Sequence, residues 1–311
     1  MHVVLDHPVL IQPEKENATI WRYMSFAKFV SFLEKEALFF SRISMLSDAS
    51  EGRLPWRNLR EWNTRIIGMF EYARNTTAVN CWHMRNGESW AMWQAYCGLT
   101  EGIAIKSSYK RLTECFKSVD GSMSNQQVVY IGMVRYLDYE ADLLESNNGY
   151  APLMCKRSVF EDDHEVRAML IPDNFLTSAF TQRALPGLYM PVDVTKLADA
   201  VVVAPGAPDW MLRLARSLVG TKCPVKRSSI AVSRYPDSPR EIELAKKIEA
   251  KVEEYVANKE ALDDEARHPL LLAAMGQVFA FKDEAEFLAH RREEEFVHQY
   301  IDWRINNAST R

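Results

Sequence analysis

Hydrophobic and polar positions follow two different patterns along the first 235 residues of the chain. Short runs of β-branched and aromatic residues, typical of buried strands, are separated by segments whose apolar residues recur at helical spacing. The first strand is predicted at Thr19–Ser25 and the second at Leu38–Arg42. Between them, apolar residues recur every three or four positions from Phe26 to Leu33, with Ser25 placed as the N-cap. The chain therefore opens with a predicted strand, helix and strand.

The same two patterns continue toward the C-terminus. Further strands are predicted at 77–82, 102–108, 126–139, 164–172, 199–204 and 225–232, and helices at 55–74, 88–97, 109–116, 143–160 and 209–220. This alternation indicates an α+β fold (mixed α/β), with a central, mostly antiparallel sheet flanked by helices. From Ser238 onward the strand pattern ends and the residues are rich in Ala, Glu and Lys, which favours helices. We therefore expect a domain at 1–237 and a helical C-terminal extension at 238–311.

Composition and charge narrow the classes of function. The chain has 311 residues, of which 47% are hydrophobic and 26% charged, and this balance is typical of a soluble globular protein. A formal net charge of −4 gives no general attraction to nucleic acid or to an anionic membrane. Neither a signal peptide nor an apolar run near the ~20 residues that span a bilayer is visible, so we expect a cytoplasmic protein. The five cysteines lack a CxxC pair and predict neither a disulfide framework nor a zinc site.

One ordered set of residues stands out between positions 20 and 235. In chain order it comprises Arg22-Tyr23, Leu38-Phe39-Phe40-Ser41, Asp48, Glu51, Cys81-Trp82, ESWAMWQAY at 88–96, GIAI at 102–105, and Lys156, Phe160, Asp163, Glu165 and Arg167. This set resembles the signature of a bacterial family designated domain of unknown function 2971, which usually has glutamate where this chain has Asp163. The resemblance implies a bacterial protein with a role in phage defence or a toxin-type system, and it implies no particular activity.

A second resemblance concerns three positions in the same order along the chain. Arg22 lies on the first strand, Ser41 on the second strand, and Glu165 on a late strand. This order is similar to the three motifs of the ADP-ribosyltransferases, which are Arg or His, then Ser or Tyr, then Glu. By analogy Arg22, Ser41 and Glu165 would be the catalytic residues of an enzyme that uses NAD.

The chemistry of NAD transfer suggests roles for neighbouring residues. The guanidinium of Arg22 suits a pyrophosphate, because its planar fork binds phosphate through two hydrogen bonds. Tyr23, or one of the two phenylalanines after Leu38, could stack on nicotinamide. The carboxylate of Glu165 could bond to a ribose hydroxyl and stabilise the positive charge that develops on the sugar. On a strand, Arg167 shares a face with Glu165 at about 6.6 Å, so both could serve one ligand.

The predicted helix at 88–97 supplies four further candidates for cofactor binding. Glu88 and Ser89 stand at its N-terminus, where free backbone N–H groups attract phosphate. Trp93 and Tyr96 would be walls for a base or a sugar. The alternative is that these aromatic residues are ordinary core residues.

Other interpretations of the same residues stay open. The residues Asp48, Glu51, Asp163, Glu165 and Lys156 could form the site of a metal-dependent phosphodiesterase, whereas the transferase hypothesis needs no metal. Asp48 and Glu51 also have the spacing of a capping box for the next helix. Arg22 could simply pair with Glu165 at the rim of the sheet. A non-enzymatic alternative is a ligand sensor or interaction protein, with the helices of 238–311 as the surface for a protein partner.

Overall fold

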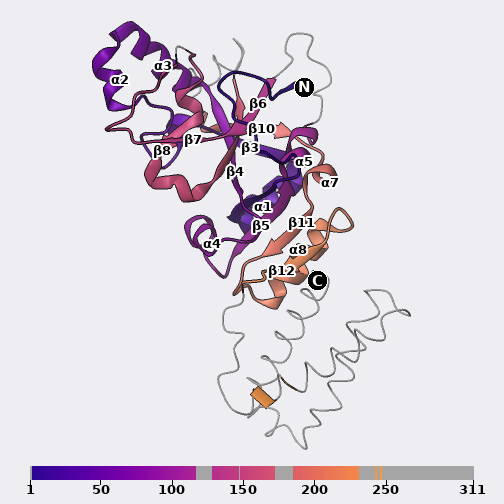
Figure 1. Ribbon diagram of the computed structural model, residues 1–311. Coiled ribbons are helices and arrows are strands. Elements are labelled where there is room, and N and C mark those ends of the chain that lie inside the picture. Colours follow the sequence, from indigo (N-terminus) through magenta and orange to yellow (C-terminus); the bar gives the residue numbers. More distant parts are fainter. Residues whose placement is uncertain are drawn as a thin grey trace, which may run out of the picture. The chain divides into compact units, whose positions relative to one another are not determined.

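The computed structural model describes residues 2–116, 128–146, 148–171, 185–230, and 242, 243 and 246 (Figure 1). The chain divides into two units, 1–230 and 231–311, and the fold described here is that of the first. The predicted helical extension at 238–311 lies almost entirely outside the described residues and stays a prediction. No helix in the described ranges is both long and apolar enough to cross a bilayer.

One sheet of ten strands forms the centre of the first unit. Its main path runs β1 (His2–Val4), β6 (Val128–Met133), β9 (Glu165–Leu170), β4 (Ala78–Met84), β2 (Thr19–Ser25), β5 (Gly102–Ser108), β11 (Ala200–Val203) and β12 (Val225–Arg227), while β3 (Ala37–Arg42) and β10 (Gly187–Pro191) branch off at β4. Within this sheet the pairs β1–β6 and β11–β12 are parallel, and the remaining described pairs are antiparallel. The prediction of a mixed fold around a mostly antiparallel sheet is therefore confirmed.

The sheet forks at one edge of β4. Strand β2 pairs with the end of β4, where Trp21 lies opposite His83, and β3 pairs with its beginning, where Ser41 lies opposite Val79. Between these two registers the branch point, Asn80–Trp82, faces no paired strand on that edge. Side chains bond the backbone there instead, because buried carbonyl groups need donors. Two such hydrogen bonds run from Arg22 Nη1 to the Cys81 carbonyl (2.6 Å) and from Asn80 Nδ2 to the Phe39 carbonyl (2.8 Å). Trp82 Nε1 donates to the Asn80 side chain, at Oδ1 (2.7 Å).

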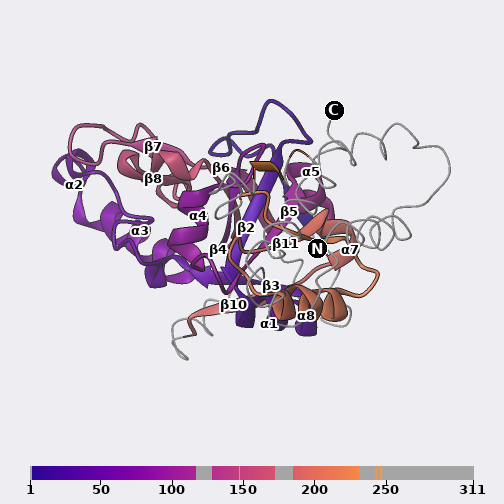
Figure 2. The ribbon, with the colours of Figure 1, turned by 90° about the horizontal axis from the view of Figure 1, so that it is seen from below.

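Helices cover the sheet and project from it (Figures 1 and 2). They are α1 (Phe26–Lys35), α2 (Trp56–Glu61), α3 (Thr64–Thr76), α4 (Trp90–Tyr96), α5 (Tyr109–Glu114), α7 (Val194–Leu197) and α8 (Asp209–Val219). Ser25 caps α1 as predicted, with its Oγ accepting from the Lys28 amide. The single helix predicted at 55–74 is wrong in one respect: it breaks at Trp62, and Asn63 caps α3 by accepting from the Ile66 amide at 3.0 Å.

Two predictions in the middle of the chain are wrong. The segment 126–139 is not one strand, because β7 (Arg135–Leu137) leaves the main sheet and pairs with β8 (Cys155–Arg157) in a separate two-stranded sheet. The helix predicted at 143–160 is absent from the described residues of that range, which hold β8 and two short 3-10 helices, Pro152–Met154 and Ser158–Asp163. Asn148, Gly149 and Pro152 explain this outcome, since all three residue types favour turns.

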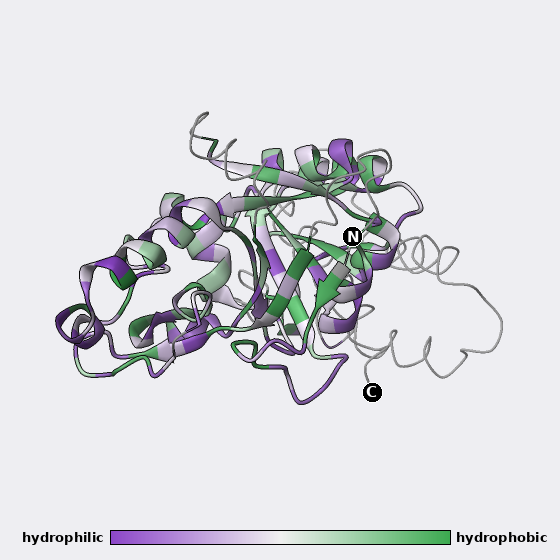
Figure 3. Cartoon of the chain, turned by 90° about the horizontal axis from the view of Figure 1, so that it is seen from above, coloured by the Kyte–Doolittle hydropathy of each residue, from purple (hydrophilic) through white to green (hydrophobic). Residues whose placement is uncertain are grey.

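The core lies on both faces of the central strands. Hydrophobic residues concentrate on these strands (Figure 3). All six residues of β9 are buried, so both of its faces are covered, including the face that Glu165 and Arg167 share. Among the residues buried on this strand are Glu165 and Arg167. Buried charged residues are unfavourable unless ion pairs and hydrogen bonds compensate them.

Candidate functional site

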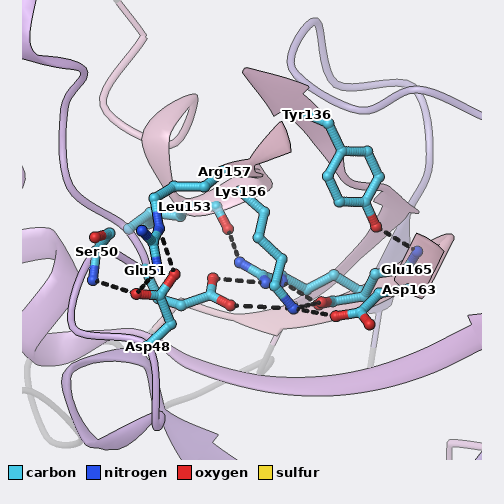
Figure 4. A network of polar contacts seen from close by, with 10 residues as sticks. Asp48, Ser50, Glu51, Tyr136, Leu153, Lys156, Arg157, Asp163 and Glu165 are labelled. Atoms are coloured by element: carbon cyan, nitrogen blue, oxygen red, sulfur yellow. Dashed lines mark hydrogen bonds and ion pairs between the residues drawn. The ribbon is translucent and has the colours of Figure 1, made fainter. Parts of the chain in front are cut away.

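Five charged side chains meet beside β9 and form what we call the charge network: Glu51, Lys156, Asp163, Glu165 and Arg167 (Figure 4). The ammonium of Lys156 lies 2.6 Å from Asp163 Oδ2, 3.1 Å from Glu165 Oε2 and 3.4 Å from Glu51 Oε1. Three carboxylates therefore surround one lysine.

Arg167 is the second cation of the charge network and is fully buried, at 0% exposure. Its Nε donates to Glu165 Oε1 at 2.7 Å, and its Nη2 donates to Glu51 Oε2 at 2.9 Å. Its Nη1 donates to the Leu153 carbonyl at 2.7 Å. Every nitrogen of this guanidinium is bonded, so Arg167 positions Glu165 and Glu51 and does not present itself to a ligand, contrary to its predicted role in cofactor binding.

The elements that hold the charge network come from distant parts of the sequence. Strand β9 supplies Glu165 and Arg167 on one face, because they are two residues apart. Lys156 lies on β8. Glu51 lies in the loop before α2, where the next residue, Gly52, has φ +71° and a side chain would approach Ile43 to 2.8 Å. A side chain at this position would be strained, so the turn that follows Glu51 favours glycine.

Burial and charge act in opposite directions on these groups. Burial by itself would raise the pKa of Glu165, but Arg167 and Lys156 lower it to about 2. Burial would lower the pKa of Lys156, but Glu165, Glu51 and Asp163 raise it. Both groups are therefore charged at neutral pH. An ionised carboxylate of this kind is suited to stabilising a positive charge and unsuited to donating a proton.

The low pKa of Glu165 predicts loss of stability in acid. Its folded pKa of about 2 lies below its ordinary value of 4.5, so its contribution to stability is present above pH 4.5 and is lost as the pH falls toward 2. One pKa unit corresponds to about 1.4 kcal/mol, so the full loss is on the order of 3 kcal/mol, of which about 2 kcal/mol falls between pH 6 and pH 3. Urea unfolding at pH 6, 4.5 and 3 measures it. The free energy of unfolding of the variant Glu165→Gln should fall less between pH 6 and pH 3 than that of the wild type. An equal fall in the two proteins would contradict the low pKa of Glu165.

Arg22 lies at the branch point of the sheet and differs from Arg167 in its bonding. It is half-buried, and its one hydrogen bond among the described residues runs from Nη1 to the Cys81 carbonyl. Burial lowers its pKa, while the nearby Tyr96 and Glu165 oppose the shift. The charge of Glu165 thus acts on Arg22. Within the described ranges the two side chains form no ion pair, so the alternative that Arg22 pairs with Glu165 at the rim of the sheet is wrong. Four of its five N–H donors remain available for an anion.

Tyr96 ends α4 beside the charge network. It is 54% exposed, and the charges of Asp163, Lys156 and Glu165 all act on its hydroxyl. Desolvation and then the charge of Asp163 raise its pKa, so the hydroxyl is a neutral donor at physiological pH. Its predicted position beside a ligand is therefore compatible with the structure.

The other predicted aromatic walls belong to the core. Tyr23 and Trp93 are 7% and 0% exposed, and their rings pack edge to face at 5.0 Å. The Tyr23 hydroxyl accepts a hydrogen bond from the Ser89 amide at 2.9 Å. Phe40 is buried, and Phe39 packs on Tyr189. Tyr23, Phe40 and Trp93 are buried, so the core alternative is correct for Tyr23 and Trp93, whereas Phe39 is half-buried against Tyr189.

The N-terminus of α4 is satisfied within the protein. Ser89 Oγ accepts from the Met92 amide, which makes it the N-cap. Glu88 accepts from Trp93 Nε1, from the Ser228 hydroxyl and from the amide and hydroxyl of Ser229. Glu88 and Ser89 therefore anchor α4 to the segment after β12 and do not form the predicted phosphate site.

Ser41 lies away from Glu165. In the sheet register Ser41 is opposite Val79, which is opposite Met169, whereas Glu165 is opposite His83. Met169 and Glu165 are four residues apart on β9, which corresponds to about 13 Å along the strand. Ser41 is therefore separated from Glu165, and the predicted triad is wrong in its second member. The charge of Glu165 acts on Arg22, but Trp21, opposite His83, is the β2 residue that shares a sheet face with Glu165, and the backbone of Arg22 directs its side chain from the other face.

The acidic residues of the phosphodiesterase alternative do converge, but on cations. Asp48 forms two hydrogen bonds with Arg157, at 3.1 and 3.2 Å, and the other three acids surround Lys156 and Arg167. Among the residues that the structure covers, no group of three His, Cys, Asp or Glu could hold a metal ion. The capping-box reading is also wrong, because Asp48 accepts from the Ser50 amide in a turn, and the next helix begins only at Trp56.

One residue of the site was missed from the sequence. His83 lies on β4 directly opposite Glu165, and its Nδ1 is 2.6 Å from the Asp163 carbonyl. In the sequence His83 stands alone, with no Ser, Cys or second His at catalytic spacing, which is typical of a structural histidine. The alternation of β4, which puts Cys81 and His83 on one face, was the available signal. Its partner strand could not be read from the sequence.

Comparison with known proteins adds no relative. No protein-family model, no curated protein and no solved structure matches the chain. The resemblance to the family designated domain of unknown function 2971, and the weaker one to ADP-ribosyltransferases, therefore stay predictions that rest on the residues named above.

Proposed function

We propose that the unit 1–230 binds NAD and cleaves or transfers its ADP-ribose portion, as an ADP-ribosyltransferase-like enzyme. One observation carries the proposal: Arg22, a half-buried cation with four free N–H donors among the described residues, lies in the electrostatic range of an ionised Glu165. A cation short of anionic partners beside a fixed carboxylate suits a ligand that carries phosphates and develops positive charge on a sugar.

Arg22 is the group for the phosphates. Its burial disfavours the charged form, and its hydrogen bond to a carbonyl compensates only in part. A phosphate oxygen would supply the missing negative charge through a charge-assisted hydrogen bond. Arg167 cannot take this role, because Glu165, Glu51 and the Leu153 carbonyl occupy it.

Glu165 is the group for the reacting sugar. When the bond between nicotinamide and the ribose carbon breaks, the electron pair leaves with nicotinamide and positive charge remains on the ribose. A carboxylate that stays ionised stabilises this charge and needs no proton transfer of its own. Because Arg167 and Lys156 hold both oxygens of Glu165, the carboxylate is already oriented before the ligand arrives.

Tyr96 is the aromatic residue that supports the proposal best. Its side chain is exposed, whereas Tyr23 and Trp93 lie in the core. Its neutral hydroxyl or its ring could contact the ligand above Glu165. A bacterial defence or toxin-type role, a cytoplasmic location and a protein partner for the helices of 238–311 remain proposals from the sequence.

The test is release of nicotinamide from NAD by the full-length protein. Glu165→Gln should lower the rate about 10²- to 10³-fold, as expected for loss of an electrostatic stabiliser. Arg22→Met should raise KM by about tenfold or more, through the lost bond to phosphate. Ser41→Ala, far along the sheet from Glu165, is the control and should behave as the wild type.

Two results would count against the enzyme. Wild-type protein that binds NAD without releasing nicotinamide would indicate a ligand sensor. Wild-type protein that neither binds nor cleaves NAD would remove NAD from consideration altogether. Circular dichroism of each variant separates lost chemistry from lost folding, since Glu165 also bonds within the charge network.

A further inference from the structure

An open surface pocket lies between α5 and α7. Its volume is about 620 Å³, within the range of about 300–1,000 Å³ that is typical of ligand pockets. Three cations line it, Lys110, Arg111 and Lys196, together with the carboxylate of Glu114. Three positive charges and one negative charge give its described lining residues a formal net charge of +2, although the whole chain carries −4. The pocket is therefore suited to an anion.

The topology of the sheet brings these side chains together. Helix α5 directly follows β5, and α7 precedes β11. Because β5 and β11 pair antiparallel, with Lys106 opposite Ala200, the end of one strand lies beside the beginning of the other. The two helices consequently lie side by side (Figure 1), and residues from both line the same pocket.

Arg111 is held in place by the C-terminus of α7. Its Nη1 donates to the Lys196 carbonyl at 2.7 Å, and at longer distances to the carbonyls of Thr195, at 3.3 Å, and Ala198, at 3.5 Å. Carbonyl groups at the end of a helix lack partners within the helix, so this guanidinium satisfies them. Its Nε and Nη2 donate to no group in the described ranges. A fixed, half-buried cation therefore keeps three N–H groups for a ligand.

The two lysines of the pocket are weakly paired. Lys110 contacts Glu16 only at 4.0 Å, and the Glu16 side chain is 80% exposed, so solvent screens this pair. Lys196 forms no ion pair with any described residue. Hydrogen bonds from the Thr195 hydroxyl and the Lys196 amide lower the pKa of Asp193, and the charge of Lys196 acts in the same direction. Both ammonium groups can thus contact an anion without breaking a close ion pair.

A phosphate group matches this arrangement in charge and in donors. A phosphate monoester carries a charge of about −1.5 to −2 at neutral pH, close to the opposite of the pocket's own charge. The planar fork of an arginine binds phosphate through two hydrogen bonds, and a lysine supplies a point charge. Ser108, which also lines the pocket, accepts from the Arg111 amide through its Oγ, so its hydroxyl hydrogen is a further donor.

We propose that this pocket binds a phosphate group, either free or at the end of a small phosphate ester, through Arg111, Lys110 and Lys196. The volume leaves room for an organic substituent on the phosphate. Arg22 and Glu165 are not among the described residues that line the pocket. The inference therefore goes beyond the proposed NAD chemistry and does not depend on it.

Calorimetric titration of the full-length protein at low salt tests the proposal, with inorganic phosphate and glycerol 3-phosphate as the two probes. We expect saturable binding, and the probe with the lower Kd identifies the source as free phosphate or an ester. Lys196→Met should raise this Kd about tenfold, the effect of one charge-assisted contact. The matched control Lys28→Met removes an exposed lysine of α1 that does not line the pocket, and it should leave the Kd unchanged.

Three results would overturn the proposal. The first is the absence of saturable binding for both probes. The second is equal weakening by Lys196→Met and Lys28→Met, which would indicate only a general attraction between charges. The third is a loss of binding in Arg22→Met with no loss in Lys196→Met, which would assign the phosphate to the proposed NAD site.

A spectroscopic measurement locates the bound phosphate directly. In nitrogen–proton NMR spectra, the Nε–H signal of Arg111 should shift as the tighter-binding probe is added, with the same saturation as the calorimetric signal. A signal that does not move would reject the pocket. Nicotinamide release is not involved in either measurement, so a protein that binds phosphate here but leaves NAD intact would reject the proposed enzyme and keep this site.

Discussion

Replacing Arg167 with methionine is expected to lower the free energy of unfolding by about 3–5 kcal/mol. The change removes the guanidinium that donates to both Glu165 and Glu51. These two carboxylates stay buried, at 5% and 4% exposure, and each loses a hydrogen bond. The lost bond to the Leu153 carbonyl leaves a third acceptor unsatisfied. Lys156 cannot compensate, because it already contacts three carboxylates. Urea unfolding at pH 7, followed by circular dichroism, measures the difference.

A matched change at the surface provides the control for Arg167. Lys106 and Asp199 form an ion pair at 3.5 Å, with side chains 38% and 46% exposed. Solvent screens such a pair, so Lys106→Met should change the free energy of unfolding by less than about 1 kcal/mol. Similar losses for the two variants would mean that the charge network is not the stabilising unit described here.

Replacing Trp93 with alanine is expected to destabilise the protein by about 3–5 kcal/mol. The side chain is fully buried, packs on Tyr23 and donates to Glu88 Oε2 at 3.1 Å. Its removal leaves a cavity under α4 and a carboxylate with one donor fewer. The same helix offers a control in Trp90, which is 44% exposed, so Trp90→Ala should cost less than about 1 kcal/mol. Thermal or urea unfolding of the two variants gives the comparison.

The Trp93 experiment also separates the core role from the predicted ligand role. A wall of a binding site can be truncated with little loss of stability, while ligand affinity falls. A core residue behaves in the opposite way. If Trp93→Ala folds with wild-type stability but fails to bind ADP-ribose, the assignment of Trp93 to the core is incorrect.

The local patterns of the sequence predicted individual elements well. The strands β2 and β5 were predicted with the bounds that the structure has, because β-branched and aromatic residues concentrate there between polar ends. The prediction of a helix at 143–160 is wrong because Asn148, Gly149 and Pro152, which favour turns, outweigh the apolar spacing of the segment. In that segment turn formation and pairing of β8 with β7 decide the outcome, and the pairing depends on residues far away in the chain.

The site could be predicted only where it depends on a single strand. Glu165 and Arg167 were placed on one face of β9 by their spacing, and this face does hold a polar site. The bond between Arg167 and Glu51 spans 116 positions, and no periodicity reports such a distance. The fork of the sheet could not be predicted either, and its register puts Ser41 opposite Val79 while Trp21 lies opposite His83, the partner of Glu165.

The branch point has a mechanical consequence. Strand β2 pairs along its whole length with β5, but with β4 only through Ile20 and Trp21. The half of the sheet that contains β5 therefore joins the half that contains β9 at a narrow seam, and the guanidinium of Arg22 ties β2 to β4 beyond the last pair. An anion bound by Arg22 would be held at this tie. Ligand affinity and the stability of the contact between the two halves would then be thermodynamically linked. A change that strengthens one must strengthen the other.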